Sequence, residues 1–139
     1  MNFFKNLFIP IFIIITLTAS GLFAKKAAIV IDFDTQEILF EVNAKTKNYP
    51  ASLTKIMTLY ILFDYLNTGK LNNNSKLKVS KIAASRSPSK LYLEEGSSIK
   101  VEDAIMALII KSANDVATVV AENIAGTEKD FAKLMTQYA

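Results

Sequence analysis

Residues 52–67 read SLTKIMTLYILFDYLN, with a hydroxyl and an amine placed ahead of a long apolar run. Apolar residues occur on every side of the helical projection and only Lys55 and Asp64 are charged, which predicts a helix buried on most sides. Ser52 and Lys55 are three residues apart and therefore share one face of the first turn. A cation here opposes the helix dipole, and a capping box would place Glu or Gln at this position. Such a departure from local rules is typical of a functional site.

The two residues have the chemistry of an activated serine. Burial would disfavour the ammonium form of Lys55, so its amine could take the proton of Ser52 and leave a nucleophile. The backbone N–H of Ser52, at the helix start, could act as one oxyanion donor. In the structural alternative, Ser52 is an N-cap and Lys55 extends to water. Ser-x-x-Lys alone does not decide, because it recurs at Ser75, Ser87 and Ser97 in polar, lysine-rich sequence that is typical of solvated surface.

The composition excludes several kinds of chemistry. The chain has no histidine, so a Ser-His-Asp triad is impossible within it, and no cysteine, which excludes disulfides, thiol catalysis and cysteine-metal sites. With 139 residues, 51% of them hydrophobic, one modest domain is expected. Without Lys5, 15 Lys and Arg stand against 13 Asp and Glu, a net charge of +2 that does not indicate nucleic-acid binding.

The first residues have the layout of a secretory signal peptide. Lys5 precedes an apolar stretch over residues 7–17, small residues follow over 19–24, and Lys25 and Lys26 come next. We predict a signal peptide over residues 1–24 with cleavage after Ala24, the alternatives being cleavage near Ala19-Ser20-Gly21 or an uncleaved anchor. The apolar core is short for a membrane span. The protein is therefore expected to be exported, to the periplasm or the outer face of a bacterial cytoplasmic membrane.

The remaining sequence predicts an α/β (α+β) fold. Two β-rich runs, 27–32 and 38–42, predict an antiparallel hairpin. Glycine at position 69 ends the helix that begins at Ser52, and Gly126 closes a later one. Further elements are expected as short extended pieces at 77–79 and 91–93 and as helices at 101–111, 116–125 and 131–138.

A second polar group interrupts the helical half of the chain. Ser112-Ala113-Asn114 is the only Ser-x-Asn in the sequence, and it falls in a break between two predicted helices. Side chains in such a break can point into a cleft. As a purely structural element, Asn114 or Asp115 would be an N-cap for the helix that follows.

With these features the chain resembles the serine D-Ala-D-Ala carboxypeptidases, the low-molecular-mass penicillin-binding proteins. The resemblance covers the chain after the signal. It is carried by Asp32-x-x-Thr35 in the hairpin turn, the run YPASLTKIMT at 49–58, the run SANDVA at 112–117, and the sixty positions between Ser52 and Ser112. It implies a β-lactamase/transpeptidase-like fold, of which the chain would contain the amino-terminal hairpin and the helical subdomain.

The resemblance also implies roles for four residues. Ser52 would attack the carbonyl of the penultimate D-Ala of a peptidoglycan stem peptide, forming an acyl-enzyme that water hydrolyses. Lys55 would be the base, Ser112 a proton relay toward the leaving amine, and Asn114 an amide that fixes Lys55 and the substrate. β-Lactams would acylate Ser52 as covalent inhibitors. No metal or organic cofactor is expected.

The sequence departs from that family in one respect. The Lys-Thr-Gly motif of a later strand is absent, since Asn67-Thr68-Gly69-Lys70 has the wrong order. We therefore interpret residues 25–139 as the amino-terminal part of the catalytic domain, lacking later sheet strands and any carboxy-terminal segment for peripheral membrane association. These residues alone are expected to be inactive or very feeble.

Three alternatives remain at this stage. A class A-like β-lactamase carries related motifs, usually with Asp where this chain has Ala113. A non-catalytic envelope protein could bind peptidoglycan with the same fold. A membrane-anchored helical interaction module would lack strands altogether.

Overall fold

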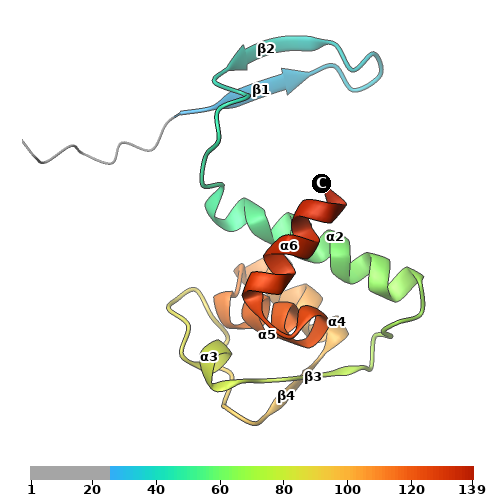
Figure 1. Cartoon of the computed structure of the whole chain (residues 1–139), viewed down its shortest axis with the longest axis vertical. Coiled ribbons are helices and arrows are strands. Elements are labelled where there is room, and N and C mark those ends of the chain that lie inside the picture. The colour runs from blue at the N-terminus through green and yellow to red at the C-terminus, as the bar shows by residue number, and fades with distance from the viewer. Residues whose placement is uncertain (1–25) are drawn as a thin grey trace, which may run out of the picture. The chain divides into compact units, whose positions relative to one another are not determined.

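The computed structural model describes residues 26–139, which form two compact units, one ending at Tyr49 and the other comprising Pro50–Ala139 (Figure 1). The signal peptide predicted for residues 1–24 lies outside the described residues. Within residues 26–139, no helix combines the length and the apolar character needed to cross a membrane.

The first unit contains the predicted hairpin. Strands β1 (Ala28–Ile31) and β2 (Ile38–Val42) pair antiparallel. In the turn between them, Oδ1 of Asp32 accepts hydrogen bonds from the backbone N–H (2.8 Å) and the hydroxyl (2.9 Å) of Thr35. The backbone bond and then the hydroxyl bond stabilise the carboxylate and lower the pKa of Asp32. The hairpin and its Asp32-x-x-Thr35 turn are confirmed.

The second unit is built around helix α5 (Asn114–Ala125), which packs against α2 (Thr54–Asn67), α3 (Lys81–Ala84) and α6 (Glu128–Tyr138). Figure 1 shows α5 and α6 at the red end of the colour scale, with α2 in green beside α6. This arrangement buries one contiguous apolar core. Its members are Ile61, Leu62, Leu77, Val79, Ala83, Ile99, Val101, Ala104, Ala107, Leu108, Ala113, Val116, Val119, Val120, Ala121 and Phe131.

A small antiparallel ladder lies beside this core. Strand β3 (Lys76–Lys78) pairs with β4 (Ser98–Lys100), and Leu77 and Ile99 face one another in the buried position. The extended piece predicted near 77–79 is confirmed, whereas the prediction at 91–93 is wrong. The backbone N–H groups of Leu91 and Leu93 donate to the side chain of Asp115 instead of to a neighbouring strand. The short α3, capped by Ser80, was not predicted.

The predicted helices form with different boundaries. The helix expected at 101–111 is α4 (Val101–Met106) continued by a π-helical turn, η2 (Ala107–Lys111), and α5 begins at Asn114, two residues before the predicted start. Helix α6 also begins earlier, because Thr127 Oγ1 accepts a capping hydrogen bond from Asp130 N (3.0 Å).

The prediction that the helix beginning near Ser52 is buried on most sides is wrong for the described residues. Only the face of α2 with Thr58, Ile61 and Leu62 is buried, because α5 and α6 pack against that face. Ile56 is 64% exposed and Tyr60 58% exposed. The apolar pattern on every side of the helix therefore did not show which face packs against the other helices.

Tyr138, in the last turn of α6, joins that helix to α2. Its hydroxyl donates to Asp64 Oδ2 (2.6 Å), and its ring meets Tyr60 edge-on with 6.0 Å between centroids. The hydrogen bond to Asp64 raises the pKa of Tyr138 from its ordinary 10.0 to about 12. Because the folded-state pKa is the higher one, the stabilisation is complete below pH 10 and is lost as the pH rises toward 12.

Tyr138→Phe is therefore expected to lower Tm, by an amount that is constant up to about pH 10 and shrinks toward pH 12. Thermal unfolding of the purified protein at a series of pH values measures this difference. Tyr49→Phe is the matched control, since Tyr49 is 100% exposed and its loss should leave Tm unchanged. A Tyr138→Phe difference that is the same at pH 8 and pH 12 would contradict the linkage.

Candidate active site

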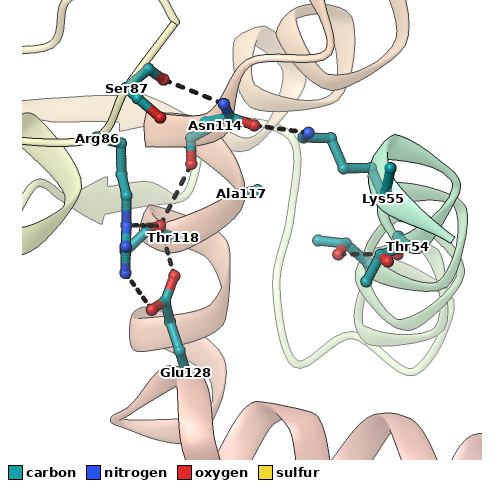
Figure 2. Close-up of a pocket in the computed structure, with 10 residues that line it drawn as sticks. Thr54, Lys55, Arg86, Ser87, Asn114, Ala117, Thr118 and Glu128 are labelled. Carbon is teal, nitrogen blue, oxygen red and sulfur yellow. Dashed lines mark hydrogen bonds and ion pairs between the residues drawn. The ribbon is translucent and has the colours of Figure 1, made fainter. Parts of the chain in front are cut away.

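A cavity of about 310 Å³ in the second unit collects polar side chains from four separate segments (Figure 2). The start of α2, the segment after α3, the first turns of α5 and the start of α6 each contribute. The lining residues are Ala51, Thr54, Lys55, Thr58, Arg86, Ser87, Asn114, Ala117, Thr118 and Glu128. Two of the four predicted site residues, Lys55 and Asn114, are among them.

Lys55 and Asn114 are in direct contact across this cavity. Lys55 Nζ, in the first turn of α2, donates a 2.8 Å hydrogen bond to Oδ1 of Asn114, the first residue of α5. Figure 2 shows the two side chains pointing toward one another from their helices. Fifty-nine positions separate them in the chain, so the fold, and not local sequence, creates the contact. Lys55 is half-buried, which leaves its amine within reach of the cavity.

The other end of the Asn114 amide is also occupied. Its Nδ2 donates to the carbonyl oxygens of Ser87 (3.1 Å) and Pro88 (3.2 Å), and its backbone N–H donates to Ser89 O (2.7 Å). Ala113, not Asn114 or Asp115, is the N-cap of α5, and it makes no side-chain cap. Asn114 is thus not the N-cap of α5, and its side chain lines the cavity.

Ser52 lies in η1 (Ala51–Leu53), the single 3₁₀ turn that leads into α2. It is not an N-cap: Leu53 holds that position for α2, and neither η1 nor α2 has a side-chain capping bond. Ser52 is exposed and does not line the cavity, although Ala51 and Thr54 on either side of it do. Ala51 has φ of 50°, a left-handed conformation that is unfavourable for alanine and typical of functional sites.

Ser112 also adopts a strained backbone, with φ 52° and ψ 42°, where η2 ends. A left-handed conformation at a residue other than glycine costs about 1–2 kcal/mol. Ser112 is half-buried and does not line the cavity. Within residues 26–139, Lys55 Nζ hydrogen-bonds Asn114 and neither Ser52 nor Ser112. Lys55 therefore contacts Asn114 directly. Ser112 has a left-handed backbone, and Ser52 follows a residue that does.

Among the cavity residues that were not predicted from the sequence, three interact with one another. Arg86 Nε donates to Thr118 Oγ1 (2.9 Å), Thr118 Oγ1 donates to Glu128 Oε1 (2.6 Å), and Arg86 forms an ion pair with Glu128. Figure 2 shows this trio on the left of the cavity and Lys55 on the right. Arg86 is the only arginine of the chain, which was a usable signal because arginine suits such forked contacts. Thr118, four residues after Asn114, shares its helix face, whereas no pattern indicated Glu128.

The chain is similar to known penicillin-binding proteins over most of its length. A solved carboxypeptidase DacD from Francisella tularensis matches with a TM-score of 0.76 and 36% identity, covering 85% of this chain and 28% of that one. Penicillin-binding protein D2 from Listeria monocytogenes, solved in an ampicillin-bound form, matches with a TM-score of 0.69 and 28% identity, covering 86% and 47%. The fold is therefore part of the transpeptidase-like fold of penicillin-binding proteins.

The sequence comparisons define the family within this class. The D-alanyl-D-alanine carboxypeptidase family, peptidase S11, matches residues 16–139. D-alanyl-D-alanine carboxypeptidase DacF of Bacillus subtilis is 36% identical over 114 residues, which are 82% of this chain and 29% of that protein. The chain belongs to the D-alanyl-D-alanine carboxypeptidase family, and it spans under a third of the length of this curated relative.

Proposed function

We propose that this chain carries the nucleophile and the base of a serine-type D-Ala-D-Ala carboxypeptidase. The observation that carries the proposal is the contact between Lys55 Nζ and Asn114 Oδ1 at 2.8 Å, one turn from Ser52, in a chain of this family. A neutral amine has two N–H donors and one lone pair. With one N–H donated to Asn114, Lys55 would keep its lone pair for the proton of Ser52.

The proposed reaction proceeds in two steps. Oγ of Ser52 attacks the carbonyl carbon of the penultimate D-Ala while Lys55 takes the hydroxyl proton. Ser112 relays a proton to the leaving amino group, and the peptide bond breaks. The terminal D-Ala departs, and the rest of the peptide stays bound to Ser52 as an ester. Water then attacks the ester, returns the hydroxyl to Ser52 and releases the shortened peptide. The strained backbone at Ala51 and Ser112 supports these roles, because such strain gathers at functional sites.

The substrate class and location follow from the same proposal. The substrates would be peptidoglycan stem peptides that end in D-Ala-D-Ala, and the protein would act in cell-wall biosynthesis. Export through the signal predicted at residues 1–24 would place it in the periplasm or at the outer face of the cytoplasmic membrane. β-Lactams would acylate Ser52, as the ampicillin-bound form of the Listeria relative suggests by analogy. Residues 25–139 would be the amino-terminal part of the catalytic domain.

The test is release of D-Ala from a synthetic stem peptide by the complete gene product. We expect stoichiometric D-Ala release together with a long-lived penicillin adduct. Fast turnover of penicillin without peptide hydrolysis would indicate a β-lactamase instead. No adduct and no D-Ala release would indicate a non-catalytic peptidoglycan-binding protein. Residues 26–139 alone, assayed in parallel, are expected to release little or no D-Ala.

A further inference from the structure

Asp115, next to Asn114 in α5, is a buried carboxylate that the proposed reaction does not use. It is 0% exposed, and no lysine or arginine within residues 26–139 forms an ion pair with it. Burial of an unpaired carboxylate is unfavourable unless donors replace its water. Here the donors are backbone N–H groups: Leu91 N lies 3.0 Å from each carboxylate oxygen, Leu93 N 3.2 Å from Oδ2, and Val116 N 2.9 Å from Oδ1.

Two of those donors belong to the segment that also holds Asn114. Residues 85–97, between α3 and β4, have no regular secondary structure, so their path depends on individual hydrogen bonds from the backbone and from side chains. Asn114 Nδ2 binds this segment at the Ser87 and Pro88 carbonyls, and Asp115 binds it at Leu91 and Leu93. Consecutive side chains of α5 thus hold the same segment at two places.

The two carbonyls determine which way the Asn114 amide faces. With Nδ2 directed at Ser87 O and Pro88 O, its Oδ1 faces Lys55. A flipped amide would set Oδ1 against the carbonyl oxygens of Ser87 and Pro88, and both contacts would be repulsive. Its NH₂ group would also face Lys55 and compete for the lone pair that the proposed base needs. The orientation toward Lys55 therefore depends on where the segment holds its carbonyls.

We propose that Asp115 is a positioning residue for acyl transfer. By binding the N–H groups of Leu91 and Leu93, its carboxylate fixes the segment whose carbonyls orient Asn114 toward Lys55. The inference rests on the proposed function and adds to it a residue that touches neither substrate nor reacting atoms. A carboxylate in the first turn of α5 also interacts favourably with the helix dipole. That interaction alone would affect the stability of the fold without affecting acylation specifically.

The test compares acylation by a fluorescent penicillin in the complete gene product and its Asp115→Asn variant. Asparagine keeps the size of the side chain but sets an NH₂ group against a backbone N–H, so it loosens the segment. We expect the acylation rate constant at saturating penicillin to fall roughly 10- to 100-fold, because small misplacements of catalytic groups have effects of this size. The dissociation constant of the non-covalent complex should change little. Asp103→Asn is the matched control, an exposed acid in the first turn of α4, and should acylate at the wild-type rate.

A second comparison separates positioning from stability. If Asp115 acts through Asn114, the double variant Asn114→Ala/Asp115→Asn should be no slower than Asn114→Ala alone. The inference would be overturned if the rate reductions of the two single variants multiplied in the double variant, or if Asp115→Asn acylated at the wild-type rate. In either case, labelling of Ser52 in the wild type would still uphold the proposed function. Absence of Ser52 labelling in the wild type would overturn both.

A milder variant covers the case in which Asp115→Asn does not fold. Ser89 is exposed, and its hydroxyl joins the same segment to Lys111 O (2.8 Å). Ser89→Ala should slow acylation, and the loss should disappear in the Asn114→Ala background. Wild-type acylation by a folded Ser89→Ala would overturn the inference.

Discussion

Ser52→Ala is expected to abolish covalent labelling by penicillin and release of D-Ala. The variant removes the only hydroxyl that stands one turn ahead of an amine at the start of an apolar helix, and the chain has no cysteine to replace it. Loss of a serine nucleophile lowers turnover by roughly 10⁴- to 10⁶-fold, which is below detection in either assay. Because Ser52 is exposed and caps no helix, Tm should stay at the wild-type value.

Ser97→Ala is the matched control for this variant. Ser97 also begins a Ser-x-x-Lys sequence, but its exposed hydroxyl donates to Glu94 O (2.6 Å) in a turn before β4. The Ser97→Ala variant should be labelled by penicillin to the same extent as the wild type. Labelling that persists in Ser52→Ala would show that another residue is the nucleophile.

Lys55→Met is expected to lower the acylation rate roughly 10²- to 10⁴-fold, the usual contribution of a general base. Methionine keeps an unbranched side chain but removes the amine that donates to Asn114. Stopped-flow or gel measurement of penicillin acylation gives the rate. Lys81→Met, an exposed position at the start of α3, should acylate normally.

Lys55→Arg distinguishes a base from a positioning cation. A guanidinium can donate to Asn114 Oδ1 but does not give up its proton at ordinary pH. Acylation should therefore stay as slow as in Lys55→Met. Recovery of the rate in Lys55→Arg would mean that Lys55 acts by charge and hydrogen bonding, and not by taking the proton of Ser52.

Local patterns predicted the parts of the fold that local chemistry determines. The hairpin followed from two β-rich runs, and the structure adds that the Asp32 carboxylate binds the Thr35 backbone and hydroxyl in the turn. The ends of α2 and α5 followed from Gly69 and Gly126, which both have positive φ. Antiparallel pairing of β3 with β4 was not predicted, since the apolar residues of 91–93 resemble a strand equally well. Only the buried Asp115 shows why those residues bind a side chain instead.

The residues of the candidate site also fall into those that motifs predicted and those that depend on the fold. Lys55 and Asn114 were expected together because the motifs resemble those of a known family, and the structure places them in contact. On the opposite side of the cavity, the ion pair of Arg86 with Glu128 joins the segment after α3 to the start of α6, and no local spacing encodes that contact. The left-handed turn at Ser112 was likewise invisible, because serine carries no intrinsic preference for it.

The central claim is that Ser52 forms the acyl-enzyme, and mass spectrometry of the penicillin-treated complete gene product tests it most directly. After proteolysis, the peptide that contains Ser52 should carry the mass of one ring-opened penicillin, and fragmentation should place the adduct on Ser52. An adduct on any other residue, or a protein that takes up none, would contradict the account.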